Sequence, residues 1–84
     1  MPDFDLINET IGLRVRAMRI SKGLTKREVG EAIGTKEHSV TRIENGRSSL
    51  SAAQLVSLAK LFGVLVSALI GEIPASEEME GGAR

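Results

Sequence analysis

The sequence predicts an all-α fold of five short helices, and three features of its pattern support that prediction. Apolar residues recur three and four positions apart, as on one face of a helix, and they do not alternate as in strands. Two segments open with a capping box, Thr25-Lys26-Arg27-Glu28 and Ser51-Ala52-Ala53-Gln54. Glycines then divide the chain into segments of helical length, at Gly23, Gly34, Gly46, Gly63 and Gly71.

The first two helices have clear signals at both ends. The first is expected over residues 7–21 and ends before Gly23, with a core stripe of Ile7, Ile11, Val15 and Met18. The second begins after the cap Thr25 and closes at Gly34, and its expected buried residues are Val29, Ala32 and Ile33.

The other three helices follow the same logic. The third is expected over residues 37–45, with Val40 and Ile43 inward and Asn45-Gly46 ending it. The fourth begins after Ser51, stops at Gly63 and buries Leu55, Leu58, Ala59 and Phe62. A short fifth helix is expected over residues 66–70.

Length and composition suit one small domain without metal or redox chemistry. The 84 residues divide into an N-terminal extension (1–6), a folded domain (7–73) and a flexible acidic tail (74–84). There is no cysteine, a single histidine (His38) and no nucleophile–base pattern, so we expect no metal, no cofactor and no enzymatic activity. No apolar run could span a membrane and the acidic N-terminus is unlike a signal peptide, which favours a cytoplasmic protein with no membrane partner.

Formal net charge is zero, but the charge is unevenly distributed. Residues 1–10 carry −3, residues 11–47 carry +5 and residues 48–84 carry −2. A neutral chain with a basic middle can present one basic face to a polyanion. The alternative from charge alone is a solvated surface of mixed sign.

The basic middle contains a specific motif. One segment begins at Gly23 and ends at Arg47, and it reads GLTKREVGEAIGTKEHSVTRIENGR. A second segment begins at Ser49 and reads SLSAAQLVSLAKLFGV. Over residues 11–71 the chain resembles the phage-repressor and Cro-like (XRE-type) helix-turn-helix family. The resemblance implies a compact five-helix lambda-repressor-like DNA-binding domain, whose partner is double-stranded DNA and whose second motif helix enters the major groove.

Candidate base-reading residues lie on the outward face of the third helix, if Val40 and Ile43 point inward. Glutamate can accept a hydrogen bond from cytosine, histidine can donate to a purine, and arginine can bind guanine through two donors. A carboxylate at this position could instead stabilise the helix N-terminus, and the arginine could be a solvated charge. The candidates are Glu37, His38, Thr41 and Arg42.

Further roles come from the resemblance and from helix-terminus chemistry. Backbone N–H groups and cations at helix ends favour phosphate. The expected phosphate contacts are Thr25, Lys26, Lys36, Asn45, Arg47 and Ser48. Arg19 and Glu44 match a structural ion pair of the family that joins the first and third helices. Two positions depart from the family pattern: Gly30 replaces a usual alanine, and Lys36 replaces a hydroxyl cap.

Apolar residues near the end of the domain exceed what one short helix requires. We expect a homodimer interface there, as in related proteins, formed by Leu65, Val66, Leu69, Ile70 and Ile73. The alternative is that all of them pack internally. A dimer would place two reading helices about 34 Å apart on a pseudo-palindrome.

Three functions are consistent with the sequence. The first is a homodimeric transcription regulator, expected to be a repressor. The second is an antitoxin-like protein that binds operator DNA and a partner toxin. The third is a protein-interaction module that has lost DNA binding, which Glu37 and the zero net charge keep open.

Overall fold

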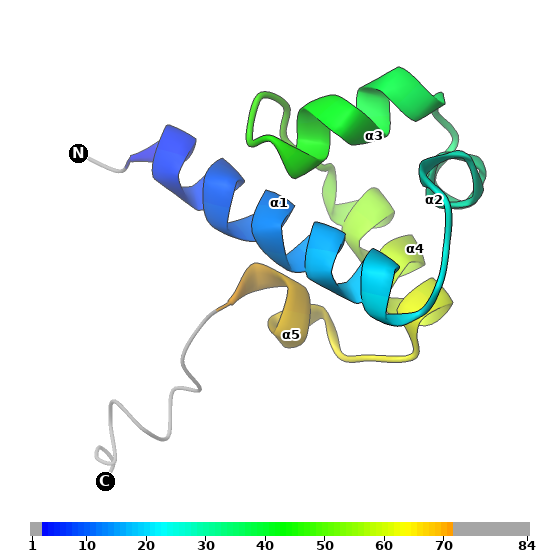
Figure 1. The fold of residues 1–84 in the computed structure, drawn as a ribbon. Helices are drawn as coiled ribbons and strands as arrows, with labels where there is room; N and C mark the ends of the chain where they lie inside the picture. The colour runs from blue at the N-terminus through cyan, green and yellow to red at the C-terminus, as the bar shows by residue number, and fades with distance from the viewer. Residues whose placement is uncertain (1–2, 72–84) are drawn as a thin grey trace, which may run out of the picture.

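The computed structural model describes residues 3–71 as five α-helices, and no strand occurs in that range (Figure 1). The helices are α1 (Phe4–Ser21), α2 (Lys26–Ile33), α3 (Glu37–Glu44), α4 (Ala52–Phe62) and α5 (Val66–Ile70). The all-α prediction is therefore confirmed. The predicted tail, residues 74–84, and the predicted interface residue Ile73 lie outside the described residues.

The first helix starts earlier than the apolar stripe predicted. Asp3 caps it, because the Asp3 carboxylate accepts a 2.9 Å hydrogen bond from the backbone N–H of Leu6. Phe4 and Leu6 therefore belong to α1, although the sequence assigned them to an extension. A carboxylate cap at an acidic N-terminus is a local signal that the apolar pattern alone does not contain.

Both predicted capping boxes are present. The Thr25 hydroxyl accepts from the backbone N–H of Glu28 at 3.0 Å, and the Glu28 carboxylate accepts from the Thr25 N–H at 2.8 Å. Ser51 and Gln54 repeat the arrangement at 3.1 Å and 3.0 Å. Lys36, at the start of α3, makes no side-chain cap, as its chemistry predicts.

Every helix contributes to one apolar core. Its fully buried side chains are Phe62, Leu58, Leu69, Val15, Val29 and Val40. Burying a side chain of this kind contributes roughly 1.5–3 kcal/mol. Two expectations are wrong at this level: Ala32 is exposed, and Ile7 remains 45% exposed near the free end of α1.

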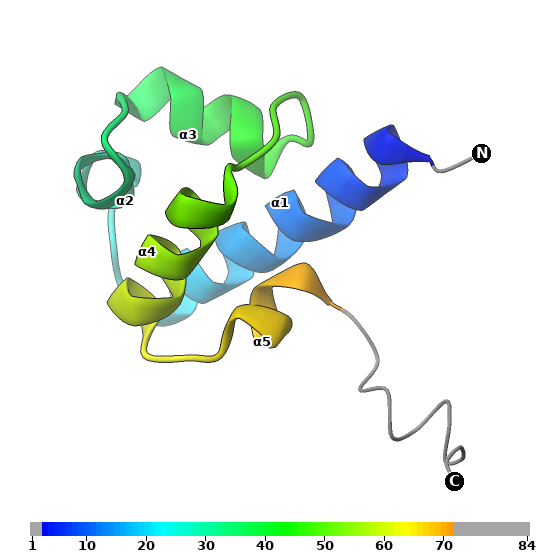
Figure 2. The same ribbon diagram turned by 180° about the vertical axis from the view of Figure 1, so that it is seen from behind.

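Helix α1 is the axis of the arrangement. In Figure 1, α3 runs along its upper side and α5 along its lower side, and both helices contact it. Figure 2 shows the opposite view, in which α4 lies in front of α1. In Figure 1 no other described helix covers the side of α1 that faces the viewer.

A buried glycine permits a close contact between α1 and α3. A Cβ on Gly12 would lie 2.8 Å from the carbonyl oxygen of Glu44 and would also collide with the carbonyl oxygen of Ile43. Only a residue without a side chain lets α1 approach the last turn of α3 so closely.

No helix within the described residues has both the length and the apolar character that a membrane span requires.

Candidate nucleic-acid interface

The α2–α3 unit is closed by a tight turn. Gly34 ends α2 in the left-handed conformation at φ 76°, and the Thr35 N–H donates to the Gly30 carbonyl at 2.8 Å. A Cβ on Gly30 would lie 2.8 Å from the Thr35 carbonyl oxygen. The departure from the family's alanine therefore has a physical reason, because the turn folds directly over Gly30.

An ion pair fixes α3 on α1. Arg19 donates to the Glu44 carboxylate through Nε at 2.6 Å and through Nη2 at 3.1 Å, and to the Leu24 carbonyl at 3.1 Å. The Glu44 side chain is only 2% exposed. The hydrogen bonds to Glu44 raise the pKa of the Arg19 guanidinium. A buried two-point pair of this kind sets orientation.

The outward face of α3 is polar, as predicted. Val40 and Ile43 are buried, whereas Glu37 and His38 in the first turn are exposed. Thr41 is half-buried, and its hydroxyl donates to the Glu37 carbonyl at 3.3 Å. The first turn of α3 therefore presents one carboxylate and one imidazole to the surroundings.

Arg42 folds toward the loop that follows α3. Its Nε donates to the Ser48 hydroxyl at 3.2 Å, and its Nη2 donates to the Arg47 carbonyl at 3.3 Å. The structure thus brings together a predicted base reader and two predicted phosphate contacts. These bonds leave the Nη1 donors and one Nη2 proton of Arg42 for an external acceptor.

The predicted phosphate contacts divide among three helix ends. Thr25 and Lys26 lie at the start of α2, and Lys36 precedes α3. At the other end of α3, Asn45 is the C-cap and Arg47 and Ser48 follow it. Cationic side chains and backbone groups lie at both ends of α3, and this arrangement favours contact with a polyanion that lies across the motif.

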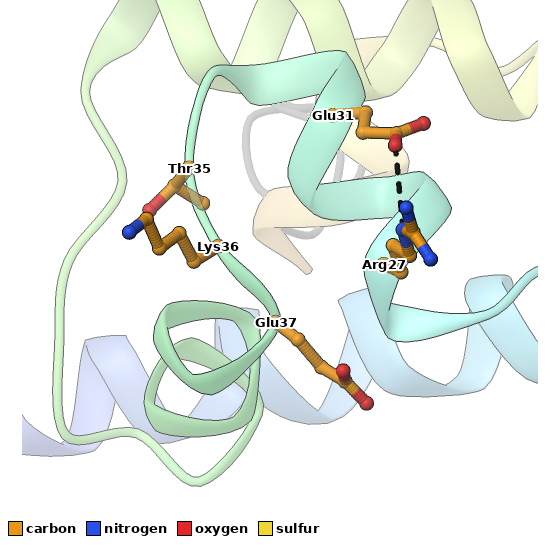
Figure 3. A pocket seen from close by; sticks show the side chains of 5 residues that line it. All are labelled: Arg27, Glu31, Thr35, Lys36 and Glu37. Atoms are coloured by element: carbon orange, nitrogen blue, oxygen red, sulfur yellow. Dashed lines mark ion pairs between the residues drawn. The ribbon is translucent and has the colours of Figure 1, made fainter.

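A shallow hollow of about 370 Å³ separates the start of α3 from the outer face of α2 (Figure 3). Arg27, Glu31, Thr35, Lys36 and Glu37 line it. Figure 3 shows the Lys36 and Glu37 side chains extending in opposite directions, and Arg27 paired with Glu31 at 3.6 Å. Because that pair is highly exposed, it adds little stability.

The α5 region only partly matches the predicted interface. Leu65 is 77% exposed, and Val66 and Ile70 are half-buried. Leu69 is fully buried in the core of the same chain, so its assignment to a dimer interface is wrong.

Two residues position the motif in ways that the sequence did not predict. Gly12 permits the α1–α3 contact, and a glycine within an apolar helical pattern was a usable signal. Gln54 was predicted only as a cap, yet its Nε2 also donates to the Ile33 carbonyl at the end of α2 at 3.3 Å. That bond joins α4 to the helix-turn-helix and has no sequence signal.

Within residues 3–71 no three His, Cys, Asp or Glu side chains are grouped in a way that could hold a metal ion. The arrangement offers hydrogen-bond donors, acceptors and cations around an exposed helix. The arrangement is therefore suited to binding another molecule through hydrogen bonds and ionic contacts.

Comparisons with known proteins also indicate a helix-turn-helix domain. The family model of the helix-turn-helix domain matches residues 10–69. The restriction-modification controller protein C.AhdI from Aeromonas hydrophila superposes with a TM-score of 0.73 at 24% identity, over 81% of this chain and 99% of that chain. The clp gene regulator ClgR from Corynebacterium glutamicum superposes with a TM-score of 0.73 at 28% identity, over 88% and 79%.

An HTH_3 family transcriptional regulator from Vibrio cholerae has a TM-score of 0.73 at 23% identity, over 87% of this chain and 41% of that chain. No curated protein sequence matches. The resemblance to a helix-turn-helix family is confirmed, since the family model covers most of the chain. The chain belongs to the helix-turn-helix domain family of DNA-binding transcription regulators.

Proposed function

We propose that the protein binds a specific double-stranded DNA site by inserting the N-terminal half of α3 into the major groove. The observation that carries this proposal is the two-sided character of α3. Val40, Ile43 and Glu44 hold its inner side in the core and on Arg19, and Glu37 and His38 extend from its exposed first turn. A helix held in this way presents base-reading groups in a fixed orientation, as major-groove recognition requires.

Within this proposal, Glu37 accepts a hydrogen bond from a cytosine amino group, and His38 donates to a purine. Thr41 contributes its methyl group to a thymine methyl, because its hydroxyl is bonded within the helix. Arg42 contacts a guanine or the adjacent phosphate with its remaining guanidinium protons. Ser48 and the Arg47 carbonyl hold the guanidinium in place.

Phosphate contacts fix the register of the motif on DNA. We assign them to Thr25 and Lys26 at the start of α2, to Lys36 before α3, and to Asn45, Arg47 and Ser48 after it. Two acids near these contacts are already engaged within the protein, since Glu28 is bonded to the Thr25 backbone and Glu44 is paired with Arg19.

We further propose that the protein acts as a homodimeric repressor on a pseudo-palindromic operator. Leu65 is the most exposed large apolar side chain of the described chain, and half-buried Val66 and Ile70 follow it in α5. These three residues are the part of the predicted α5 interface that the fold leaves accessible. Occupation of an operator that overlaps a promoter would block transcription.

Selection of bound sequences from a random duplex pool, followed by a salt titration on the selected site, tests DNA binding. We expect a consensus with two related half-sites and a log–log salt slope of about −0.9 for each phosphate neutralised. Lys36→Ala should reduce that slope, whereas Lys60→Ala, a control at an exposed cation of α4, should leave it unchanged. Failure to enrich any sequence at low salt would exclude the proposed function.

A further inference from the structure

Helix α1 has a second apolar side that the fold does not use. Leu6, Leu13 and Ile20 are 57%, 63% and 55% exposed, although each is a large aliphatic residue. With Thr10 and Ala17 they form a regular series at spacings of four, three, four and three residues. We call these five residues the outer seam of α1.

The outer seam lies opposite the core side of the same helix. At 3.6 residues per turn, the seam residues centre about half a turn away from buried Val15 and its neighbours Ile11 and Met18. In Figure 1, α3 lies above α1 and α5 lies below it. The seam therefore contributes nothing to the core of one protomer, and its spacing is that of a coiled-coil contact.

Charges beside the seam indicate what covers it. Glu9 lies four residues before Leu13, Arg16 lies three residues after it, and both project on the same flank of the seam by helical periodicity. An antiparallel second copy centred on Leu13 would bring Glu9 of each copy level with Ala17 of the other, one residue from Arg16. In a parallel two-fold pair this flank would instead face the opposite flank of the second copy, so Glu9 and Arg16 would not be brought together, and flanking charges of this kind set helix orientation.

We propose that the outer seam of α1 binds the outer seam of a second copy, antiparallel, about a two-fold axis at Leu13. Leu13 then packs on Leu13 of the second copy, and Leu6 of each copy packs on Ile20 of the other. The small residues Thr10 and Ala17 allow close approach between these apolar layers. Because α1 is already folded on its own core, the contact orders no additional backbone.

The same axis places both reading helices on one side of the pair. The last turn of α3 and the loop after it lie on the Glu9 flank: a Cβ on Gly46 would lie 2.9 Å from the Glu9 Cα, and Gly12 contacts Glu44. A two-fold axis perpendicular to the paired helices keeps this flank on the same side in both copies. Both α3 helices can then approach one duplex, a consequence that rests on the proposed function. The seam contact is separate from the α5 contact proposed above, since it leaves the α5 surfaces accessible.

Cysteine cross-linking of the full chain tests the pairing, because the protein contains no cysteine of its own. We expect Leu13→Cys to cross-link to itself with a short bifunctional maleimide. Leu6→Cys alone should not cross-link, since two such residues would lie about 21 Å apart at 1.5 Å per residue. A mixture of Leu6→Cys and Ile20→Cys chains should cross-link, and Ala53→Cys on α4 is the exposed control.

Charge reversal provides an independent test that does not alter the apolar seam. We expect Glu9→Arg and Arg16→Glu each to weaken self-association at least tenfold in sedimentation equilibrium, and the double variant to restore it. Circular dichroism would verify that each variant is folded. Leu65→Glu should leave the Leu13→Cys cross-link intact, because it alters only the α5 surface.

Each result bears on the proposal separately from DNA binding. Self-cross-linking of Leu6→Cys would show a parallel pair, and absence of the Leu13→Cys cross-link at micromolar concentration would exclude any seam pair. A protein that binds selected DNA but shows neither cross-link would retain the proposed function and lose this inference. Seam cross-links in a protein that binds no DNA would support this inference and exclude the proposed function.

Discussion

Arg19 of α1 holds the buried carboxylate of Glu44 in α3 through two hydrogen bonds, and a third bond reaches the Leu24 carbonyl. This pair lies at the opposite end of α3 from Glu37 and His38. The carboxylate therefore anchors the inner end of the reading helix, and the first turn remains exposed. The geometry of the motif depends on a pair that takes no part in DNA contact itself.

Removal of Arg19 should strongly destabilise the fold. Arg19→Ala leaves the Glu44 carboxylate buried and unpaired, which costs about 3–5 kcal/mol. Urea denaturation followed by circular dichroism measures the loss. Arg19→Met with Glu44→Leu removes both charges together and should recover most of that stability. Equal losses in the single and double variants would contradict the role assigned to the pair.

Gly30→Ala should destabilise the protein, although helix propensity alone predicts the opposite sign. Alanine is better than glycine within a helix by about 1 kcal/mol. A Cβ at this position would meet the Thr35 carbonyl oxygen at 2.8 Å, and overpacking of this kind costs about 1–3 kcal/mol. Thermal unfolding of Gly30→Ala would decide the sign, and a raised melting temperature would show that the turn can relax.

Arg42 and Lys26 should differ in how they affect DNA binding. We expect Arg42→Ala to cost about 1–3 kcal/mol on the selected site and to relax base preference at one position. Lys26→Ala should weaken binding to all sequences alike and reduce the salt slope by about 0.9. Titrations on the selected site and on single-base variants separate these effects. An unchanged base preference in Arg42→Ala would assign the guanidinium to phosphate.

Glu37→Gln should strengthen non-specific DNA binding and alter the preferred base. The carboxylate is exposed at the start of α3, which the proposed function brings close to the phosphates of a bound duplex. The amide removes that repulsion and exchanges cytosine recognition for an adenine contact. Parallel sequence selection with both proteins measures the change. His38→Gln is the neighbouring comparison, and it should alter base preference without a gain in non-specific affinity.

Local signals determined the elements of this fold. The capping boxes at Thr25 and Ser51 and the glycines after α2 and α4 correctly placed those helices, because their hydrogen bonds form between residues three or four positions apart. The inward positions Val40 and Ile43 followed from periodicity. The early start of α1 was missed since Asp3 lies outside the apolar pattern, although it too acts locally.

Contacts between distant segments were harder to predict. Ala32 has the right spacing for burial, yet the elements around α2 leave it exposed, and Leu69 was assigned to an interface but fills the core. Periodicity identifies a face of a helix, and only the neighbouring helices decide whether that face is covered. The same limit applies to the outer seam of α1, whose exposure is invisible before α3 and α5 are placed.

The sequence by itself therefore determined that there are five helices, the capping boxes of α2 and α4 and the polar face of the reading helix, because these depend on residues within one or two turns of each other. The tertiary structure decided which glycines are required by close approach and how Arg42 is held. It also decided which apolar residues remain free to bind a second copy. Those properties depend on the distances between segments far apart in the chain, which packing of the whole core fixes.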